Sequence, residues 1–230
     1  SAMIAHGRGE AFDYLLGEVT SESAMSAIHE TSARLLSAER PVISVNGNTV
    51  VLAGEDLIRV AAVVGCPIEV NLYYRTPERV SGLLGRLSQQ RDAVASEPAP
   101  GSWEGDWQEA VGSVVLLGDA ADHSLPGLEG PRAKCCREGI GEADVILVPL
   151  EDGDRCEALV AAGKQVLVVD LNPLSRTAMT ATVTIVDEVS RAATELLGEV
   201  VAGDCESSEW NNAAALNAAL EIISDASAEA

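Results

Sequence analysis

Short runs of β-branched and other apolar residues recur along the chain, and segments with a helical pattern separate them. Six such runs can form strands, at residues 41–46, 68–73, 114–117, 144–148, 166–170 and 183–186. Helical patterns occupy 23–38, the stretch that begins at Thr76-Pro77, and the stretch from Asp154 to Ala162. Strands that alternate with helices favour parallel pairing with right-handed crossovers. The pattern therefore predicts an α/β fold with a mostly parallel sheet flanked by helices.

Composition agrees with that fold and suggests how the chain divides. Hydrophobic residues make up 47% of the chain but aromatic residues only 3%, so the core must consist of Val, Leu, Ile and Ala, as in buried parallel strands. We expect one α/β domain over residues 1–200. Within it, 97–112 holds two prolines and two tryptophans without a clean period, which predicts a surface insertion. The acidic, Ala-rich stretch 201–230, with a helical run near 212–223, is either a docking helix or a loose tail.

Acidic residues outnumber basic ones by 36 to 15, which gives a formal net charge of −21. A negative field of this size disfavours binding to nucleic acid and to anionic lipid, both of which need cationic groups. The chain is either an ordinary acidic protein or one adapted to a high-salt cytoplasm, where salt screens the repulsion between carboxylates. Lys134 and Lys164 are the only two lysines, and this scarcity favours the halophilic interpretation.

The five cysteines show no Cys-x-x-Cys spacing, so we expect plain thiols in a reducing compartment and no zinc site. The three histidines are too scattered to predict a metal site. No apolar run reaches membrane-spanning length and no signal peptide is evident, which predicts a cytoplasmic protein. The chain opens at Ser1-Ala2-Met3 inside an apparently ordered segment, so either the first two residues are foreign or an N-terminal piece is missing.

Two polar clusters with glycines have both a functional and a structural interpretation. In His6-Gly7-Arg8-Gly9-Glu10, the glycines let the backbone approach a ligand while the Arg8 guanidinium matches a phosphate, although a simple glycine turn with a surface arginine is equally compatible. In Ser44-Val45-Asn46-Gly47-Asn48, two amides follow a strand and can hold hydroxyl groups. An ordinary Asn-Gly turn explains the second cluster at least as well.

A third cluster, Glu69-Val70-Asn71-Leu72-Tyr73-Tyr74-Arg75, alternates polar and apolar residues, so Glu69, Asn71 and Tyr73 share one side. Burial would leave Glu and Asn without water, which favours a functional role. The fourth runs from Pro149 to Thr177. Its acids Glu151, Asp152 and Asp154 could bind the Mg²⁺ that a nucleotide carries, or could bind the amine of a substrate. Alternatively, they cap a helix. Further on, Asp170 ends an apolar strand, and Arg176-Thr177 can open a helix toward phosphate, without a Walker loop.

Several of these segments occur in the order found in a known family. They are Ile-Ala-His-Gly-Arg-Gly-Glu-Ala-Phe-Asp-Tyr-Leu from Ile4, Ser-Val-Asn-Gly-Asn from Ser44, Glu-Val-Asn-Leu-Tyr-Tyr-Arg from Glu69, Val-Pro-Leu-Glu-Asp-Gly-Asp-Arg from Val148 and Val-Asp-Leu-Asn-Pro-Leu-Ser-Arg from Val169. The chain thus resembles the archaeal phosphopantothenate synthetase family, the 4-phosphopantoate–β-alanine ligases of coenzyme A biosynthesis, from Ile4 to Arg191. The resemblance implies a homodimeric, Rossmann-like α/β fold that uses ATP and Mg²⁺. It also implies an archaeal source, which fits the acidity.

The resemblance implies an ATP site, and the geometry of strand ends adds a site for the acid substrate. The residues that match the family's ATP contacts are Arg8, Asp170, Leu171, Asn172, Arg176, Thr177, Glu188 and Val189. Glu188 replaces the expected Asn, so base recognition there would depend on backbone groups. The residues expected to bind the acid are Asn46, Asn48, Asn71, Tyr73 and Arg75, because ligands bind where parallel strands end. Neither a catalytic residue nor a metal ligand is assigned.

The implied reaction is ligation with an acyl-adenylate intermediate, giving 4'-phosphopantothenate, AMP and pyrophosphate. Three features depart from the family pattern: the helical segment that usually precedes the His-Gly-Arg motif is absent, and neither 97–112 nor the C-terminal stretch has a counterpart. The alternative is a non-catalytic module that binds adenine nucleotides and regulates another protein. The two polar walls, at 46–48 and 69–75, favour the ligase because a sensor needs only one ligand site.

Overall fold

The computed structural model describes residues 11–203 and 206–228. A six-stranded sheet with strand order β3-β2-β1-β6-β7-β8 forms its centre, and every pair of neighbouring strands is parallel. The strands are β1 (Pro41–Val45), β2 (Ile68–Val70), β3 (Leu116–Leu117), β6 (Val145–Pro149), β7 (Gln165–Val169) and β8 (Val183–Ile185). All six overlap the runs that the sequence predicts, with β6 and β7 each extending one residue beyond, so the α/β fold class is confirmed.

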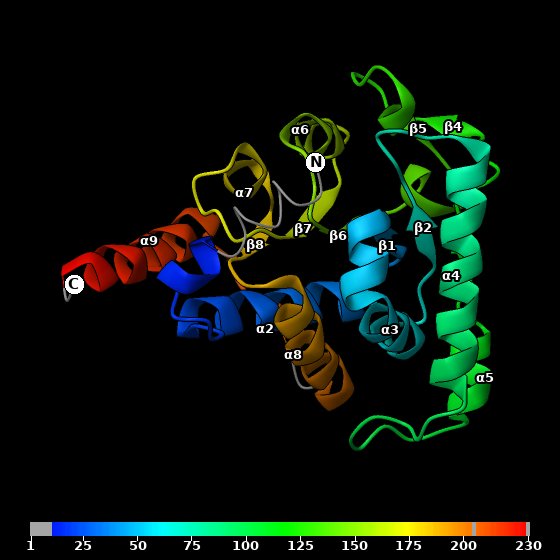
Figure 1. The fold of residues 1–230 in the computed structure, drawn as a ribbon, viewed down its shortest axis with the longest axis horizontal. Coiled ribbons are helices and arrows are strands. Elements are labelled where there is room, and N and C mark those ends of the chain that lie inside the picture. Colours follow the sequence, from blue (N-terminus) through cyan, green and yellow to red (C-terminus); the bar gives the residue numbers. More distant parts are fainter. Residues whose placement is uncertain (1–10, 204–205, 229–230) are drawn as a thin grey trace.

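Helices cover both faces of the sheet (Figure 1). One face carries α2 (Glu22–Ser37), α3 (Gly47–Val64) and α8 (Val189–Ala202), and the other carries α6 (Gly153–Ala161) and α7 (Arg176–Thr180). At the β2–β3 end stand α4 (Pro77–Ala95) and α5 (Trp107–Gly112), while α9 (Asn212–Ala228) lies beyond β8. Each face of the sheet has its own apolar cluster, with Ile43 and Leu147 on one side and Val42 and Ile146 on the other.

The strand order reverses direction between β1 and β6. From β1 the chain moves outward to β2 and β3, whereas from β6 it moves the opposite way to β7 and β8. In such a sheet the loops after the two central strands diverge to opposite faces, which opens a crevice at the carboxyl ends of those strands. The residues that follow β1 and β6 are therefore expected to line this crevice.

A small hairpin and two short helical turns close the same end of the sheet. The hairpin pairs β4 (His123–Ser124) with β5 (Lys134–Cys135) in antiparallel fashion, with His123 opposite Cys135. A 3₁₀ turn, η1 (Pro131–Ala133), precedes β5, and a π-helical turn, η2 (Arg137–Gly141), follows it. His123, one of the three scattered histidines, therefore lies in a strand of this hairpin.

Two helices escape prediction, and one predicted cap is wrong. Helix α3 is buried along much of its length, with Val50, Leu57 and Val60 all fully enclosed, so it shows no clear polar face. Helix α8 was not predicted, although its buried residues recur at helical spacing: Val189, Ala192, Ala193, Leu196 and Val200. Helix α6 begins at Gly153 with Asp152 as its N-cap, where the sequence predicts Asp154, because the Asp152 carboxylate accepts from the Arg155 backbone N–H at 3.0 Å.

The two segments expected to be additions both contact the core. Range 97–112 ends in α5, whose Trp107 and Val111 are buried, and the Trp107 indole donates to the Val94 carbonyl at 3.2 Å. Helix α9 contains the predicted run 212–223, and its Leu216 is buried in a cluster with Leu16 and Val186. The four cysteines that the structure describes are free and buried, as the sequence predicts. No helix in the described ranges is both long and apolar enough to cross a membrane.

Candidate functional site

The crevice between β1 and β6 is lined by a loop whose successive carbonyl groups are all held by side chains. Thr49 Oγ1 donates to the Pro149 carbonyl at 3.1 Å, and Asn46 Nδ2 donates to the Leu150 carbonyl at 2.8 Å. Thr177 Oγ1 donates to the next carbonyl, that of Glu151, at 3.1 Å. Three elements, α3, β6 and α7, are thereby fixed to one another at the strand ends.

Asn46 and Asn48 have different environments, although the sequence predicts both as substrate contacts. Asn46 Oδ1 caps α3 by accepting from the backbone N–H groups of Asn48 and Thr49 at 2.9 and 3.1 Å. With its amide group bound to Leu150, Asn46 acts as a cross-link between the two central strands. Asn48 is exposed in the first turn of α3. Its backbone is held, and its side chain remains accessible for a ligand.

Leu150 lies at φ 61°, in the left-handed region that a residue with a Cβ rarely adopts. Such a backbone persists only where its surroundings hold it, and it concentrates at functional sites. Here the Asn46 and Thr49 bonds on either side supply that hold. The unusual turn is what sends Glu151 away from the path of β6 and toward the crevice.

Glu151 lies between two buried guanidinium groups. One carboxylate oxygen is paired with Arg132 Nη2 and the other with Arg155 Nη1. Arg132 also contacts Asp152 at 3.3 Å, and Arg155 Nη2 donates to Ser44 Oγ at 3.1 Å. Burial lowers the pKa of both arginines to about 10, and each side chain stays cationic at neutral pH. The pairing neutralises charge that would otherwise be expensive to bury.

Each carboxylate of the acidic run 151–154 has a partner within the protein. Glu151 is held by two arginines, Asp152 caps α6, and Asp154 pairs with Arg176 at 2.5 Å. Within the described ranges, no group of three or more His, Cys, Asp or Glu side chains is arranged to hold a metal ion. In this arrangement the carboxylates of the run pair with the protein's own arginines or cap α6.

Four buried polar atoms at this end have no hydrogen-bond partner among the described residues. They are Nε of Arg132, Nε of Arg155, Nη1 of Arg75 and Oδ1 of Asn71. Buried polar groups are almost always satisfied, so a cluster of exceptions is a signature of a ligand site or of bound water. Three of the four atoms belong to cationic groups, which makes the cluster suited to an anion.

Of the residues after β2, Asn71 and Leu72 are buried, whereas Tyr73 and Tyr74 are exposed. Asn71 is 1% exposed and Nδ2 donates to the Lys134 carbonyl at 2.9 Å, so it faces protein. Tyr73 and Tyr74 are exposed, with their rings edge to face at 4.9 Å. Arg75 Nη2 donates to the Gly118 carbonyl. Of the predicted substrate residues here, Tyr73 and Arg75 can reach a ligand directly, and Asn71 only through its unpartnered oxygen.

Arg75 lies on the wall of a groove of about 1180 Å³ between α4 and the β4–β5 hairpin. Lys134 contributes a second cation to the same wall. The rest of the lining includes one carboxylate, that of Asp119, together with hydroxyl and apolar side chains, among them Thr76, Ser81, Ser88, Ser124, Val80 and Leu84. A groove with two cations and several hydroxyl groups suits a small acid that carries a phosphate.

The predicted nucleotide residues gather after β7. Asp170 accepts from the Asn172 backbone N–H at 2.9 Å and from the Ser175 hydroxyl. Burial raises the pKa of the Asp170 carboxyl, and those two bonds oppose the shift. Arg176 is half-exposed at the start of α7. Its guanidinium lies so close to Gly153, at the start of α6, that a Cβ at Gly153 would overlap it. The first turns of α6 and α7 are therefore in contact. Leu171 is partly buried beside α9. Thr177 is the residue whose hydroxyl group donates to the Glu151 carbonyl.

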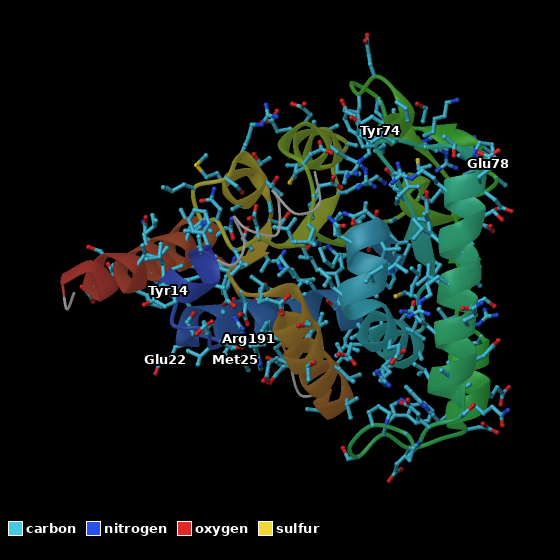
Figure 2. The ribbon with its side chains drawn as sticks, in the orientation of Figure 1. Tyr14, Glu22, Met25, Tyr74, Glu78 and Arg191 are labelled. Atoms are coloured by element: carbon cyan, nitrogen blue, oxygen red, sulfur yellow. The ribbon has the colours of Figure 1, made fainter. Side chains whose placement is uncertain are left out.

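Glu188 and Val189, the remaining described nucleotide candidates, lie after β8. Glu188 is the N-cap of α8 and accepts from the Ser190 and Arg191 backbone N–H groups at 2.9 and 3.2 Å. Val189 is buried in the core, so its backbone is what it can offer to a ligand. Figure 2 shows Arg191 and Tyr14 at this side of the molecule, well separated from Tyr74 and Glu78 on the α4 side. Arg8 lies outside the described residues.

Sequence reasoning missed Arg132 and gave no separate role to Arg155 or Thr49. Arg155 stands in a motif that the sequence analysis quotes, and its place four residues after Glu151 is a recognisable helical ion-pair spacing. Arg132 occurs in a Gly-Pro-Arg turn with no local signal, and it reaches Glu151 only because the chain folds the hairpin over the strand ends.

Comparison with known proteins identifies the family to which this architecture belongs. Residues 23–226 match the phosphopantothenate/pantothenate synthetase family. A relative from Thermococcus kodakarensis, named 4-phosphopantoate–β-alanine ligase, is 46% identical over 192 residues, which cover 84% of this chain and 66% of the relative. A relative of the same name from Methanosarcina mazei is 47% identical over 190 residues, 83% of this chain and 66% of the relative.

One from Methanospirillum hungatei, also of that name, is 45% identical over 190 residues, 83% of this chain and 69% of the relative. The chain therefore spans about two thirds of the length of the curated relatives that it matches. The match extends through the strand ends, the α6–α7 junction and the β8 exit described above. The chain belongs to the phosphopantothenate/pantothenate synthetase family.

Proposed function

We propose that this protein is an ATP-dependent ligase that joins 4-phosphopantoate to β-alanine in coenzyme A biosynthesis. The observation that carries the proposal is family membership, because three relatives at 45–47% identity bear the name of that ligase. The arrangement of the strand ends is compatible with it. One polar region follows β7 and β8, and a second follows β1 and β2, so two different ligands can meet at the crevice between them.

The region after β7 is our candidate for ATP. Arg176 is accessible at the start of α7, and Asp170, Leu171 and Asn172 belong to the turn that leads to it. Thr177, the next residue of α7, donates to the Glu151 carbonyl. Arg8, Glu188 and Val189 complete the proposed nucleotide set. The net charge of −21 repels ATP, so local guanidinium groups must supply the attraction. Mg²⁺ carried by ATP would neutralise phosphate charge, and no protein carboxylate in the acidic run needs to bind it.

The groove that holds Arg75 and Lys134 is our candidate for the acid substrate. The other proposed contacts do not line this groove: Asn46 and Asn48 follow β1, and Asn71 and Tyr73 follow β2. Arg75 can bind the phosphate through Nη1, which has no protein partner among the described residues. In the first step the substrate carboxylate attacks the α-phosphorus of ATP, and pyrophosphate leaves. In the second, the β-alanine amine attacks the acyl carbon, AMP leaves and the amine loses a proton. The protein's contribution would be positioning and charge stabilisation.

Exchange of labelled pyrophosphate into ATP tests the first step. With ATP, Mg²⁺ and 4-phosphopantoate but without β-alanine, we expect label to enter ATP, because adenylate formation is reversible. Pantoate without its phosphate should support little exchange, because Arg75 would lose its ligand. Absence of exchange with 4-phosphopantoate would contradict the acyl-adenylate, and equal exchange with both acids would contradict recognition of the phosphate.

We also propose a homodimer in the cytoplasm, with no nucleic-acid or membrane partner, as the family resemblance and the acidic composition suggest. The competing proposal is a regulatory module that binds adenine nucleotides without catalysis. It would bind ATP and show no exchange with any acid, so the same measurement separates the two functions.

A further inference from the structure

Two side chains of the β2 region hold a segment that lies more than sixty residues further along the chain. The Glu69 carboxylate accepts from the backbone N–H groups of Cys136 and Ile140 at 2.9 and 2.8 Å. Asn71 Nδ2 donates to the Lys134 carbonyl at 2.9 Å and reaches the Arg132 carbonyl at 3.4 Å. Glu69 is 0% exposed and Asn71 1%, so their contacts are with this segment rather than with solvent.

The segment is built to receive the Glu69 carboxylate. At Gly139, any Cβ would overlap Glu69 Oε2, so only glycine allows this approach. Burial raises the pKa of Glu69, while the N–H groups of Ile140 and Cys136 and the positive charges of Arg155 and Arg75 favour its ionised form. A carboxylate that accepts two backbone N–H groups fixes both ends of the π-helical turn η2 relative to β2.

The held segment carries two cations of the candidate site. Arg132 pairs with Glu151 and contacts Asp152 at 3.3 Å. Lys134 lines the groove beside Arg75. The chain has only 15 basic residues against 36 acidic ones, so the attraction of an anion to this site would depend on where these two cations stand.

We propose that Glu69 and Asn71 are positioning residues that fix segment 132–140 and thereby set where Arg132 and Lys134 stand at the crevice. Because both side chains are buried, their effect on the site would pass through the segment that they hold. The proposal depends on the proposed ligase function only for the identity of the anion that these cations receive.

Glu69→Gln tests the proposal, because it keeps the shape but turns one acceptor into a donor that faces a backbone N–H. We expect the KM for 4-phosphopantoate to rise roughly tenfold, about the effect of one lost hydrogen bond to a charged group, while the KM for ATP changes little. Gly139→Ala should give the same split by displacing the carboxylate. Leu35→Ala, in α2 on the far face of the sheet, is the control for general loss of stability and should change neither KM.

Amide hydrogen exchange tests the same idea without the ligase reaction. In the wild-type protein the amides of Cys136 and Ile140 should exchange slowly, and in Glu69→Gln they should exchange at least tenfold faster while those of β7 stay protected. Fast exchange at both amides in the wild type would overturn the proposal, whether or not the variants fold. So would a KM split no greater than that of Leu35→Ala. If no ligase activity is found, the proposed function fails, and hydrogen exchange alone then decides the positioning role.

Discussion

The Asn46 amide donates a hydrogen bond of 2.8 Å to the Leu150 carbonyl, and so ties the end of β1 to the loop after β6. The same side chain caps α3 through its oxygen, so one residue fixes both sides of the crevice. Leu150 keeps a backbone angle of φ 61° that few residues adopt. The bond therefore helps to fix the position of Glu151, the next residue, and of its two arginine partners.

Asn46→Ala should destabilise the protein by about 1–3 kcal/mol, because it removes both the cap and the bond to Leu150. Asn46→Asp keeps the cap acceptors but loses the donor, so it isolates the contribution of the Leu150 bond. We expect the free energy of unfolding, from urea titration, to fall in both variants and more in Asn46→Ala. Wild-type stability in both would show that the loop after β6 is held without Asn46.

Arg176→Ala should lower kcat/KM for ATP by roughly ten- to a hundredfold, because a hydrogen bond to a charged group contributes about 1.5–3 kcal/mol. Arg8→Ala should do the same. The fold should survive the loss of Arg176, which is half-exposed and paired with Asp154 and Glu157 at the surface. Exposed Arg86 on α4 is the matched control. Arg91 would be a poor control because it donates to the Val114 carbonyl at 2.8 Å. Unchanged ATP kinetics in Arg176→Ala would remove this residue from the site.

Asp144 should make stability depend on pH in the acid range. Burial would raise the pKa of its carboxyl, but the N–H groups of Glu39, Arg40 and Val145 outweigh burial and hold the pKa below its ordinary value of 3.8. The carboxylate thus stabilises the fold above the unfolded pKa, and that contribution is lost as pH falls through the lower folded pKa. Asp144→Asn should lower Tm at pH 7, and its difference from wild type should shrink below about pH 4. A difference that does not vary with pH would argue that charge is irrelevant there.

The sequence could predict the sheet but only part of the site. Most of the strands are largely apolar runs, and β2 lies in an alternating one, so all six could be recognised from local sequence. The polar strand ends were also readable, as with Asp170 and Arg176. The orientation of the Asn71 side chain could not be predicted from the sequence. Strand β2 ends at Val70, and the Asn71 amide then points toward the β4–β5 hairpin, where it donates to the Lys134 carbonyl. The partnership of Arg132 with Glu151 depends on tertiary packing, and no local pattern encodes it.

Salt should stabilise this protein if its acidity reflects a high-salt cytoplasm. A net charge of −21 repels itself, and molar KCl reduces the Debye length to about 3 Å, which screens that repulsion. We expect Tm to rise steadily from dilute buffer to molar KCl. A Tm that is flat or falls over this range would contradict the halophilic interpretation and leave the ligase proposal intact.

Product analysis with ATP, Mg²⁺, 4-phosphopantoate and β-alanine together is the most direct test of the central proposal. The account predicts 4'-phosphopantothenate, AMP and pyrophosphate in equal amounts, and no 4'-phosphopantothenate when any one substrate is omitted. Formation of ADP and phosphate would instead indicate an acyl-phosphate route. ATP binding without any condensation product would contradict the ligase assignment and favour a nucleotide-binding regulatory module.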